Sequence, residues 1–339
     1  MSEHARPRIA IYGVGSVGGY LGGRLSAGAR VTYIGRRRVI DALRMNGLTW
    51  SDLKGNRGRI AAKSLDLQLD PFAAAKANLI LVTVKSAATA TVARELAGVI
   101  APGVPVISFQ NGLHNAEALR AALPKHPVLA GMVPFNVLQR GPGCFHQGSG
   151  GELMVETHPS LAPFLPLFAA AGLPLQQRHD MAAVQAAKLL LNLNNAVNAL
   201  SNLPLKEELS QRSWRRCLAM AQREALNVFA AAGIQPAKLT PLPPRWLPRV
   251  LEFPDACFKR LASRLLAIDP LARSSMWEDL EAGRPTEVDA INGEIVRLAT
   301  THALQAPVNT RLVSLMHDAE RARRACSAEK LLDELRAAQ

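Results

Sequence analysis

Glycines near the start of the chain have the spacing of a phosphate-binding turn. Gly13, Gly15 and Gly18 follow an apolar segment at residues 9–12 and precede a stretch of helical periodicity at residues 17–25. In such a turn the first glycine permits the tight bend, the second lets the backbone approach a pyrophosphate, and the third lets the helix pack on the strand. This order predicts a dinucleotide site, and an ordinary tight turn is the alternative.

Arginines follow the second predicted strand. Residues 30–35 lead directly into Arg36, Arg37 and Arg38. Proteins that bind NAD usually carry a carboxylate at this point for the ribose hydroxyls. Guanidinium groups are instead suited to bind a 2′-phosphate, so we predict NADP(H), with Arg36 as the leading contact. A solvated basic turn is the alternative; it fits Arg38 best, and Arg37 fits either interpretation.

Polar residues also follow two later predicted strands. Lys85 comes directly after an apolar run at residues 78–84, and Asn111 follows residues 104–109. The carboxyl ends of parallel strands form the ligand-binding edge of such a sheet. A lysine there can reach cofactor or substrate, and an asparagine amide can both donate and accept hydrogen bonds. A surface lysine and a plain Asn-Gly turn are the alternatives. The expected cofactor contacts are Gly13, Gly15, Ser16, Val17, Gly18, Arg36, Lys85 and Asn111.

A lysine and two asparagines share one face of a helix predicted at residues 181–201. Lys188, Asn192 and Asn195 are spaced i, i+4 and i+7, and leucines occupy the other faces. Asparagine is unfavourable inside helices, so its repetition here indicates another use. A partly buried lysine has a lowered pKa and can act as a general acid or hydrogen-bond donor. A solvent-facing polar stripe is the alternative.

Capping residues begin two later predicted helices. Ser274 and Ser275 are suited to an N-cap, and Thr286 with Asp289 resembles a capping box. Glu287 lies in the first turn, where a carboxylate stabilises the helix dipole. On local pattern alone, these residues serve as helix caps.

The elements that must position these residues fall into two parts. Short apolar strands alternate with helices up to about residue 180, which predicts a Rossmann domain with a doubly wound α/β sheet at residues 1–180. Residues 181–339 show long helical stretches without a convincing strand, so this second domain is expected to be all-helical. A cleft between two such domains is a common site for small molecules. Further helices are expected at residues 213–232, 255–267, 274–282, 286–303 and 327–338.

Two connecting segments have distinct compositions. Residues 141–151 contain several glycines and are predicted to form a hairpin. Residues 235–254 are rich in proline and are predicted to be an irregular excursion.

Composition narrows the class of partner. The chain has 339 residues, which suits two domains, and 40 basic against 27 acidic residues give a net charge of +13. A basic balance can indicate nucleic acid or anionic membranes. The arginines are scattered, however, and aromatic residues make up only 5%. We therefore expect an anionic small ligand and a solvated basic surface, and neither nucleic acid nor membrane as a partner.

The cysteines and the N-terminal residues point to the cytoplasm. Cys144, Cys217, Cys257 and Cys326 are far apart and lack the spacing of a metal site, so no metal is expected. The N-terminal residues lack the apolar core of a signal peptide. No apolar run reaches the roughly 18 residues of a transmembrane helix.

These segments together resemble the ketopantoate reductase (2-dehydropantoate 2-reductase) family, in order and over nearly the whole chain. The resemblance implies a Rossmann domain followed by a helical domain of the 6-phosphogluconate dehydrogenase C-terminal type. Its most specific blocks begin at Ser274 and Thr286. The matching segments are the glycine turn with Arg36, Val82-Thr-Val-Lys85, Gln110-Asn-Gly112, Lys188-x-x-x-Asn192, Ser274-Ser-Met-x-x-Asp-Leu-x-x-Gly283 and Thr286-Glu287-Val-Asp-x-x-Asn-Gly293.

The resemblance also implies an activity and residue roles. It implies reduction of 2-dehydropantoate to pantoate with NADPH, a step of pantothenate and coenzyme A biosynthesis. Lys188 matches the catalytic lysine that donates to the ketone oxygen, and Glu287 matches the acid that orients it. Asn192 and Ser275 match residues that bind the substrate hydroxyl and carboxylate. Lys85 and Asn111 match residues near the nicotinamide ribose and the reacting centre.

Departures from the family pattern affect the substrate-contacting elements. Ala196 and Ala272 replace asparagines that are frequent in the family, and Arg273 follows as either a carboxylate clamp or a solvent-facing residue. Asn195 lies on the face of Lys188 and is a candidate substitute for the missing amide. Reduction of another 2-keto acid, a different two-domain dehydrogenase and a non-enzymatic NADP(H) sensor are the alternatives. A homodimer is a further prediction.

Overall fold

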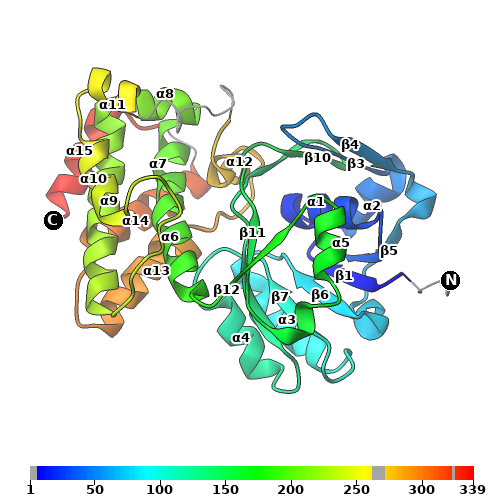
Figure 1. Ribbon diagram of the computed structural model, residues 1–339. Coiled ribbons are helices and arrows are strands. Elements are labelled where there is room, and N and C mark those ends of the chain that lie inside the picture. Colours follow the sequence, from blue (N-terminus) through cyan, green and yellow to red (C-terminus); the bar gives the residue numbers. More distant parts are fainter. Residues whose placement is uncertain (1–5, 262–271, 323–324) are drawn as a thin grey trace. The chain divides into compact units, whose positions relative to one another are not determined.

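The computed structural model describes residues 6–261, 272–322 and 325–339. The chain divides into two compact units, Met1–Met181 and Ala182–Gln339, which are described separately (Figure 1). In the described part of the chain, no helix has the length and apolarity needed to cross a membrane. The same residues hold no group of three or more histidine, cysteine or acidic side chains that could bind a metal ion.

Most strands of the first unit form one eight-stranded sheet. Its order is β12-β11-β8-β7-β6-β1-β2-β5, and the strands from β8 to β5 are all parallel to their neighbours. β11 pairs antiparallel with β8 and parallel with β12. The strands of this unit are β1 (Arg8–Tyr12), β2 (Arg30–Ile34), β3 (Leu48–Ser51), β4 (Arg57–Ile60), β5 (Asp66–Gln68), β6 (Leu79–Val82), β7 (Val106–Ser108), β8 (Val128–Met132), β9 (Val137–Gly141), β10 (Cys144–Gln147), β11 (Leu153–Glu156) and β12 (Leu175–Arg178).

Apolar side chains cover this sheet on both faces. In β1, Ile9 and Ile11 belong to one buried cluster, and the alternating Ala10 and Tyr12 belong to another. A strand buried on both faces is expected to be apolar throughout, which explains why the parallel strands could be recognised in the sequence. The doubly wound fold is therefore confirmed. The helices of this unit are α1 (Ser16–Leu25), α2 (Arg37–Asn46), α3 (Thr89–Ala97), α4 (Asn115–Ala122) and α5 (Leu165–Ala170).

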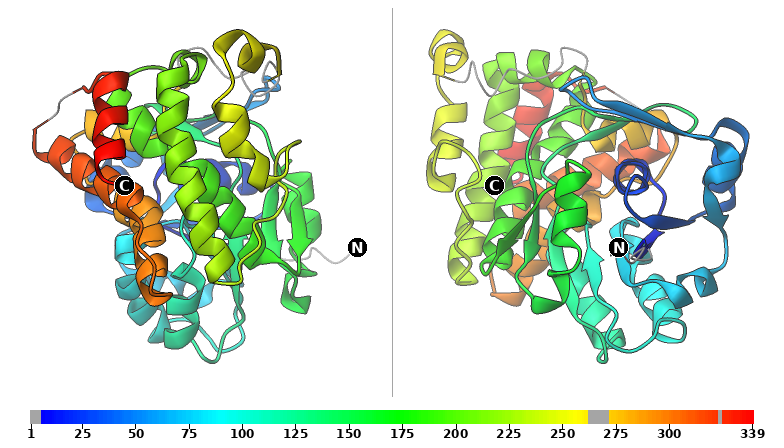
Figure 2. Two further views of the ribbon diagram at one scale, coloured as in Figure 1. Left: turned by 90° about the vertical axis from the view of Figure 1, so that its left-hand side faces the viewer. Right: turned by 45° about the vertical axis from the view of Figure 1, so that its right-hand side comes forward.

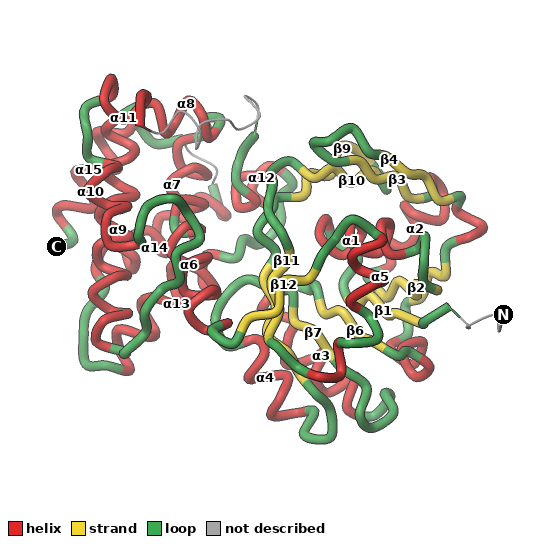
Figure 3. The backbone as a smooth tube through the Cα atoms, viewed as in Figure 1, coloured by secondary structure: helices red, strands yellow, loops and turns green. Residues whose placement is uncertain are grey.

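A smaller four-stranded sheet packs against α1. Its order is β4-β3-β10-β9 (Figure 3). Helix α1 presents glycines to this sheet, and a Cβ at Gly19 would lie 2.4 Å from the ring of Phe145. A Cβ at Gly23 would lie 2.8 Å from the ring of Trp50. The predicted hairpin at residues 141–151 is displaced, because its strands are β9 and β10 and its turn follows Gly141.

The second unit is helical, and no strand is assigned in the described part of residues 182–339. The 20-residue α9 packs against α7, α10, α14 and α15, and Figure 2 shows α15 beside it. The helices are α6 (Met181–Asn192), α7 (Asn194–Ser201), α8 (Leu205–Ser210), α9 (Arg212–Ala231), α10 (Leu247–Leu251), α11 (Asp255–Leu261), α12 (Ser275–Glu281), α13 (Val288–Thr301), α14 (Pro307–Arg321) and α15 (Ala328–Ala337).

Several helices differ from the sequence-based expectation. The helix predicted as continuous over residues 181–201 is divided at Leu193 into α6 and α7. Helix α14 was not predicted. The C-terminal part of the helix predicted at residues 255–267 lies outside the described residues.

A buried arginine holds the proline-rich excursion against α9. Arg215 is fully buried, and its guanidinium donates to the carbonyl oxygens of Leu251 at 3.0 Å and Phe253 at 2.7 Å. It also forms an ion pair with Asp255 at 2.8 Å. Because a buried guanidinium is costly unless its donors are satisfied, these carbonyls fix the path of the segment. The excursion is therefore ordered and includes α10.

Candidate functional site

The glycine turn has a conformation that only glycine adopts readily. Gly13 has a φ of +107°, and its N–H donates to the carbonyl oxygen of Ile34 at 2.9 Å. The N–H of Gly15 donates to the carbonyl oxygen of Gly13 at 2.9 Å, which closes the bend between β1 and α1. The hydroxyl of Thr83, just after β6, donates to the same carbonyl at 2.6 Å. The turn is thus braced by the neighbouring strand.

Two glycines of the turn face different surroundings. A Cβ at Gly18 would lie 2.2 Å from the carbonyl oxygen of Gly13 and 2.5 Å from the hydroxyl of Thr83. A Cβ at Gly15 would meet no described atom within 4 Å, and Gly15 is exposed at the N-cap of α1, where no side chain caps the helix. Open space at an uncapped helix N-terminus fits a pyrophosphate, because the first-turn N–H groups and the helix dipole attract anions. The amides of Ser16, Val17 and Gly18 belong to this first turn.

This contrast predicts different effects for two alanine variants, one on stability and one on dinucleotide binding. Gly18→Ala should lower the free energy of unfolding by about 1–3 kcal/mol, because its Cβ overlaps backbone and side-chain atoms. Gly15→Ala should leave stability nearly unchanged but weaken dinucleotide binding, because the Cβ occupies the space proposed for the phosphate. Thermal unfolding and cofactor titration of both variants separate the effects. Equal stability of the two variants would contradict the packing argument.

The arginine run lies where the second strand ends. Arg36 is the N-cap residue of α2 and follows β2 after Gly35. Arg36, Arg37 and Arg38 are all exposed. No acidic residue stands between the end of β2 and the first turn of α2. Exposed guanidinium groups at this edge can approach a ribose phosphate, so the NADP(H) assignment stays a prediction compatible with their placement.

A hydrogen-bond network holds the two loops that carry Lys85 and Asn111. Both residues are half-buried, and the hydroxyl of Ser86 donates to the carbonyl oxygen of Asn111 at 3.0 Å. Gln110 donates through its amide to the carbonyl oxygen of Val84 at 3.1 Å. Both loops follow parallel strands, β6 and β7, at the edge where ligands bind in this architecture.

Buried residues behind these loops were missed by the sequence analysis. The amide of Gln110 also donates to the hydroxyl of Thr89 at 2.7 Å, and that hydroxyl donates to Asn115 at 2.7 Å. The amide of Asn115 reaches back to Ser86 at 3.0 Å. Gln110 precedes Asn111 directly, and its polarity at the end of an apolar strand was the one available signal. The network therefore holds the two loops in fixed positions relative to each other.

The predicted polar stripe of the second unit is only partly covered by neighbouring groups. Lys188, Asn192 and Asn195 are half-buried, whereas their neighbours Leu189 and Leu193 are fully buried. The division between α6 and α7 preserves this stripe, because Leu193 keeps right-handed helical dihedral angles, with φ −56° and ψ −22°. Burial lowers the pKa of the Lys188 ammonium to about 8. A lysine with this pKa can exchange a proton near neutral pH.

The lowered pKa predicts a pH dependence for any reaction in which Lys188 donates a proton. Loss of the proton from Lys188 removes the donor, so kcat/KM for reduction should fall as the pH rises through about 8. Initial rates across the pH range measure this limb. A rate that stays constant well above pH 8 would contradict a protonated Lys188 in the reacting enzyme.

A second set of asparagines in the same segment has a structural role. Asn194 and Asn198 are buried, and their amides donate to the carboxyl group of Glu208 in α8 at 3.3 Å and 2.7 Å. Asn198 Oδ1 accepts from the N–H of Ser274 at 2.8 Å, and the Ser274 hydroxyl donates to the carbonyl oxygen of Asn195 at 3.0 Å. These contacts fix the start of α12, which Ser275 begins, against α7. The i, i+4 spacing of Asn194 and Asn198 was the available signal.

The buried carboxyl group of Glu208 should make the free energy of unfolding depend on pH. Burial raises its pKa to about 8 from an ordinary 4.5, although hydrogen bonds from Asn198 and Asn194 act in the opposite direction. The folded protein then binds this proton more tightly than the unfolded chain. Stability relative to Glu208→Gln should therefore fall as the pH rises from about 4.5 to about 8, by up to about 1.4 kcal/mol per pH unit. Urea unfolding of both proteins across this window measures the difference, and a constant difference would contradict a buried protonated Glu208.

Of the two predicted helix caps, the one before α12 is confirmed and the one before α13 is not. Ser274 caps α12 as expected, because its hydroxyl accepts from the N–H of Trp277 at 3.2 Å. The capping box predicted for Thr286 and Asp289 is wrong. Glu287 is the N-cap residue of α13, and its side chain makes no capping hydrogen bond. The Thr286 hydroxyl accepts from the N–H of Val288 at 3.3 Å, but the N–H of Thr286, which a capping box pairs with the acid, donates to Glu320 at 2.8 Å.

The candidate residues of the second unit therefore come from three places. Lys188 and Asn192 lie on α6, Asn195 and Ser275 lie on the packed α7–α12 pair, and Glu287 begins α13. Glu287 is half-buried. Its role as the partner of Lys188 stays a prediction.

The residues that depart from the family pattern all make contacts within the second unit. Ala196 and Ala272 are buried, and the carbonyl oxygen of Ala272 accepts from the N–H of Leu205 at 2.8 Å. Arg273 donates to the carbonyl oxygen of Asn202 and lies over the ring of Trp277 at 4.2 Å. Arg273 is thus engaged by its own unit rather than simply facing solvent.

Comparison with known proteins matches both units. The family model Ketopantoate reductase PanE/ApbA matches residues 9–160, and the model of its C-terminal domain matches residues 180–320. The chain is 29% identical over 322 residues to a 2-dehydropantoate 2-reductase of Halobacterium salinarum, covering 93% of this chain and 99% of the relative.

Solved structures show the same fold. A PanE/ApbA family ketopantoate reductase from Ralstonia eutropha JMP134 is 29% identical, with a TM-score of 0.78, over 93% of this chain and 99% of that chain. D-mandelate dehydrogenase, in a ternary structure with NADH and anilino(oxo)acetate, is 19% identical with a TM-score of 0.75 over the same shares. The two family models span most of both units, and the chain belongs to the ketopantoate reductase PanE/ApbA family.

Proposed function

We propose that this protein reduces a 2-keto acid with NADPH, and that 2-dehydropantoate, reduced to pantoate, is its first candidate substrate. The observation that carries the proposal is the half-buried Lys188, whose pKa is lowered to about 8 and which shares a polar stripe with Asn192 on an otherwise apolar helix. A lysine on such a face can donate a proton to a substrate oxygen. Family membership supports an oxidoreductase.

The first unit supplies the proposed cofactor site. The amides of the α1 first turn would hold the pyrophosphate, and Arg36 would hold the 2′-phosphate. Lys85 and Asn111 would contact the nicotinamide ribose from the loops braced by Gln110. Bound NADPH would supply a hydride from nicotinamide C4 to the carbonyl carbon of the substrate.

The second unit supplies the proposed acid. Negative charge grows on the carbonyl oxygen during reduction, and the Lys188 ammonium stabilises that charge and gives up a proton to the oxygen. Glu287 would hold the ammonium by a charge-assisted hydrogen bond. Asn192, Asn195 and Ser275 would bind the hydroxyl and carboxylate of the substrate.

Another 2-keto acid is the second candidate. Ala196 and Ala272 place methyl groups where amides are frequent in the family, which leaves fewer donors for a hydroxylated substrate. D-mandelate dehydrogenase has a similar fold, so this fold is also found in a dehydrogenase that is named for another substrate. A less polar or bulkier keto acid fits this change.

A substrate panel tests the proposal. NADPH oxidation is measured with 2-dehydropantoate, pyruvate, branched 2-keto acids and phenylglyoxylate under identical conditions. The highest kcat/KM should belong to a 2-keto acid, with 2-dehydropantoate as the first expectation. Tight NADPH binding without turnover of any member would overturn the proposal in favour of a sensing protein. A homodimer stays a prediction that sedimentation of the purified protein tests.

A further inference from the structure

A groove lies on the small sheet of the first unit. It has a volume of about 450 Å³, within the range of small-molecule sites. All of its lining residues belong to or adjoin β3, β4, β9 and β10. They are Thr49, Trp50, Ser51, Arg57, Gly58, Arg59, Arg140, Cys144, Phe145 and His146.

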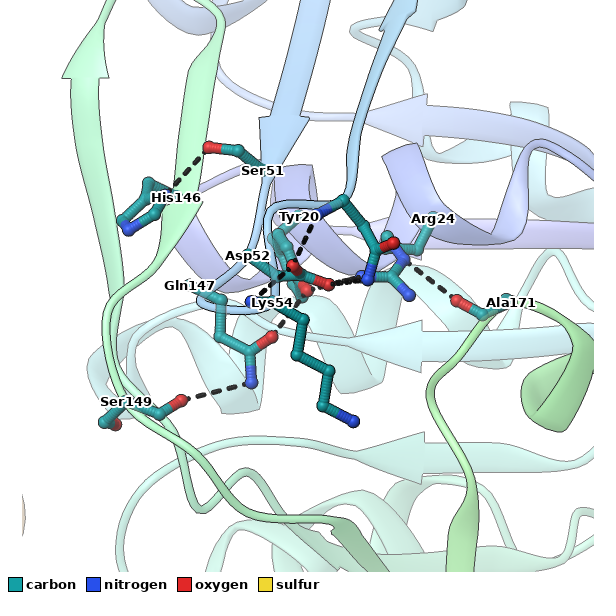
Figure 4. Close-up of polar contacts among 10 residues, drawn as sticks. Tyr20, Arg24, Ser51, Asp52, Lys54, His146, Gln147, Ser149 and Ala171 are labelled. Atoms are coloured by element: carbon teal, nitrogen blue, oxygen red, sulfur yellow. Dashed lines mark hydrogen bonds and ion pairs between the residues drawn. The ribbon is translucent and has the colours of Figure 1, made fainter.

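The inner face of this sheet is fixed by packing on α1. Figure 4 shows Arg24 beside Tyr20 and Asp52, and its guanidinium donates to the Tyr20 hydroxyl at 2.9 Å and to the Asp52 carboxylate at 3.0 Å. The guanidinium of Arg24 lies 4.3 Å from the ring of Trp50 and also donates to the carbonyl oxygen of Ala171 at 2.9 Å. Both Arg24 and Asp52 are buried, so this pair is shielded from solvent. The groove therefore has a rigid floor.

The residues that alternate with Trp50 and Phe145 point to the opposite face of the sheet. The strand register pairs Thr49 with Arg59, and Ser51 with Arg57. Because side chains on paired positions share a face, these four residues form one surface. The Ser51 hydroxyl lies 2.8 Å from His146 Nδ1, as Figure 4 shows, so hydroxyl and imidazole groups form part of the surface.

Positive charge flanks the groove from both sheet edges. Arg57 and Arg59 lie on the edge strand β4, and Arg140 lies on the opposite edge strand β9. The described lining residues include no carboxylate. Arg57 and Arg59 are exposed, share one face of β4, and form no ion pair with another described residue. Like charges placed side by side on a strand repel, so a bound anion would stabilise this arrangement.

We propose that this groove binds a small phosphate-bearing anion of the di- or triphosphate class, at a site separate from the glycine turn. Arginine forks match phosphate geometry, and a hydroxyl beside them adds a neutral donor. Arg57 and Arg59 hold the anion from the edge strand β4, over Ser51 and Thr49. The size of the groove favours a small molecule over a macromolecular partner.

Calorimetric titration of the full-length protein with inorganic tripolyphosphate tests the site, with saturating NADPH present to occupy the dinucleotide site. The test variant is R57Q/R59Q. The matched control is R30Q/R94Q, which removes the same charge from exposed arginines of the same unit. We expect one site per chain, roughly tenfold or more weaker in R57Q/R59Q and nearly unchanged in the control. R57K/R59K, which keeps charge without the planar fork, should be intermediate.

Three results would overturn the proposal. They are no binding to the wild-type protein, equal weakening in both glutamine variants, and much tighter binding of a short single-stranded DNA through the same arginines. The NADPH-oxidation rate of R57Q/R59Q should match the wild type, because neither arginine belongs to the proposed reductase machinery. Titration without NADPH, compared between R36Q and R57Q/R59Q, separates the groove from the dinucleotide site even if the proposed reductase function fails.

Discussion

Lys188→Ala should reduce kcat for keto-acid reduction by roughly 10²- to 10⁴-fold, the range typical for loss of a general acid. The substitution removes the ammonium that stabilises and protonates the carbonyl oxygen. The dissociation constant for NADPH should stay nearly unchanged, because the proposed cofactor contacts belong to the first unit. Single-turnover kinetics and fluorescence titration of NADPH measure the two quantities on the same preparation.

The control for this variant is Lys206→Ala, which removes an exposed lysine from α8 of the same unit. Its kcat should match the wild type. Partial rescue of Lys188→Ala by an added primary amine would further indicate that the missing group is an acid. Near-native turnover of Lys188→Ala would refute the catalytic role, and a large rise in the NADPH dissociation constant would indicate a cofactor-binding role instead.

Arg36→Asp should convert the cofactor preference from NADPH toward NADH. Loss of a charge-assisted hydrogen bond to phosphate costs about 1.5–3 kcal/mol, and the new carboxylate repels the 2′-phosphate. The dissociation constant for NADPH should therefore rise roughly 100-fold. That for NADH should change little or fall, because a carboxylate at the end of β2 can accept hydrogen bonds from the ribose hydroxyls.

Arg38→Asp is the matched control, since it makes the same charge change at the second residue of α2. Its ratio of NADPH to NADH affinity should shift much less. Both variants are compared at one ionic strength, because long-range attraction of the cofactor is screened by salt. An unchanged ratio in Arg36→Asp, or equal shifts in the two variants, would contradict the assignment of Arg36.

The central strands could be predicted from the sequence because a strand buried on both faces has apolar residues at every position. Residues 79–82 are fully buried on both faces of the sheet, so every position is apolar. Strands β3 and β4 of the small sheet were not predicted, for the opposite reason. In β4, the sequence Arg57-Gly-Arg-Ile60 has exposed arginines alternating with half-buried residues, and four residues are too few to establish a period. Its stability comes from packing on α1, which only the tertiary structure reveals.

One missed helix carried a usable signal. Val308, Leu312, Met316 and Ala319 of α14 are spaced at helical intervals and are all buried. Pro307 stands at the first helical position, where proline is favoured. This pattern is sufficient to predict the helix. The position of its more distant partners is not, because α14 packs on α7 and α9, which are far away in sequence, as well as on the preceding α13.

The candidate site was predictable where a residue conflicts with its surroundings. Lys188 is an ammonium on a leucine-rich helix, and that conflict is visible in the sequence. Glu208 and Asn198 carry no such conflict locally, because their buried state arises from α7, α8 and the start of α12 coming together. Gln110 is polar at the end of an apolar strand, but that signal does not reveal its partners, Val84 in the loop after β6 and Thr89 in α3.

Transfer of deuterium tests the central claim most directly. The protein is incubated with 2-dehydropantoate, or with the best keto acid of the panel, and NADPH carrying deuterium at nicotinamide C4, with each of the two faces labelled in turn. The proposed function predicts that one of the two labelled cofactors transfers a single deuterium to C2 of the hydroxy-acid product. Oxidation of NADPH without deuterium at C2 from either cofactor, or no oxidation with any 2-keto acid, would contradict it.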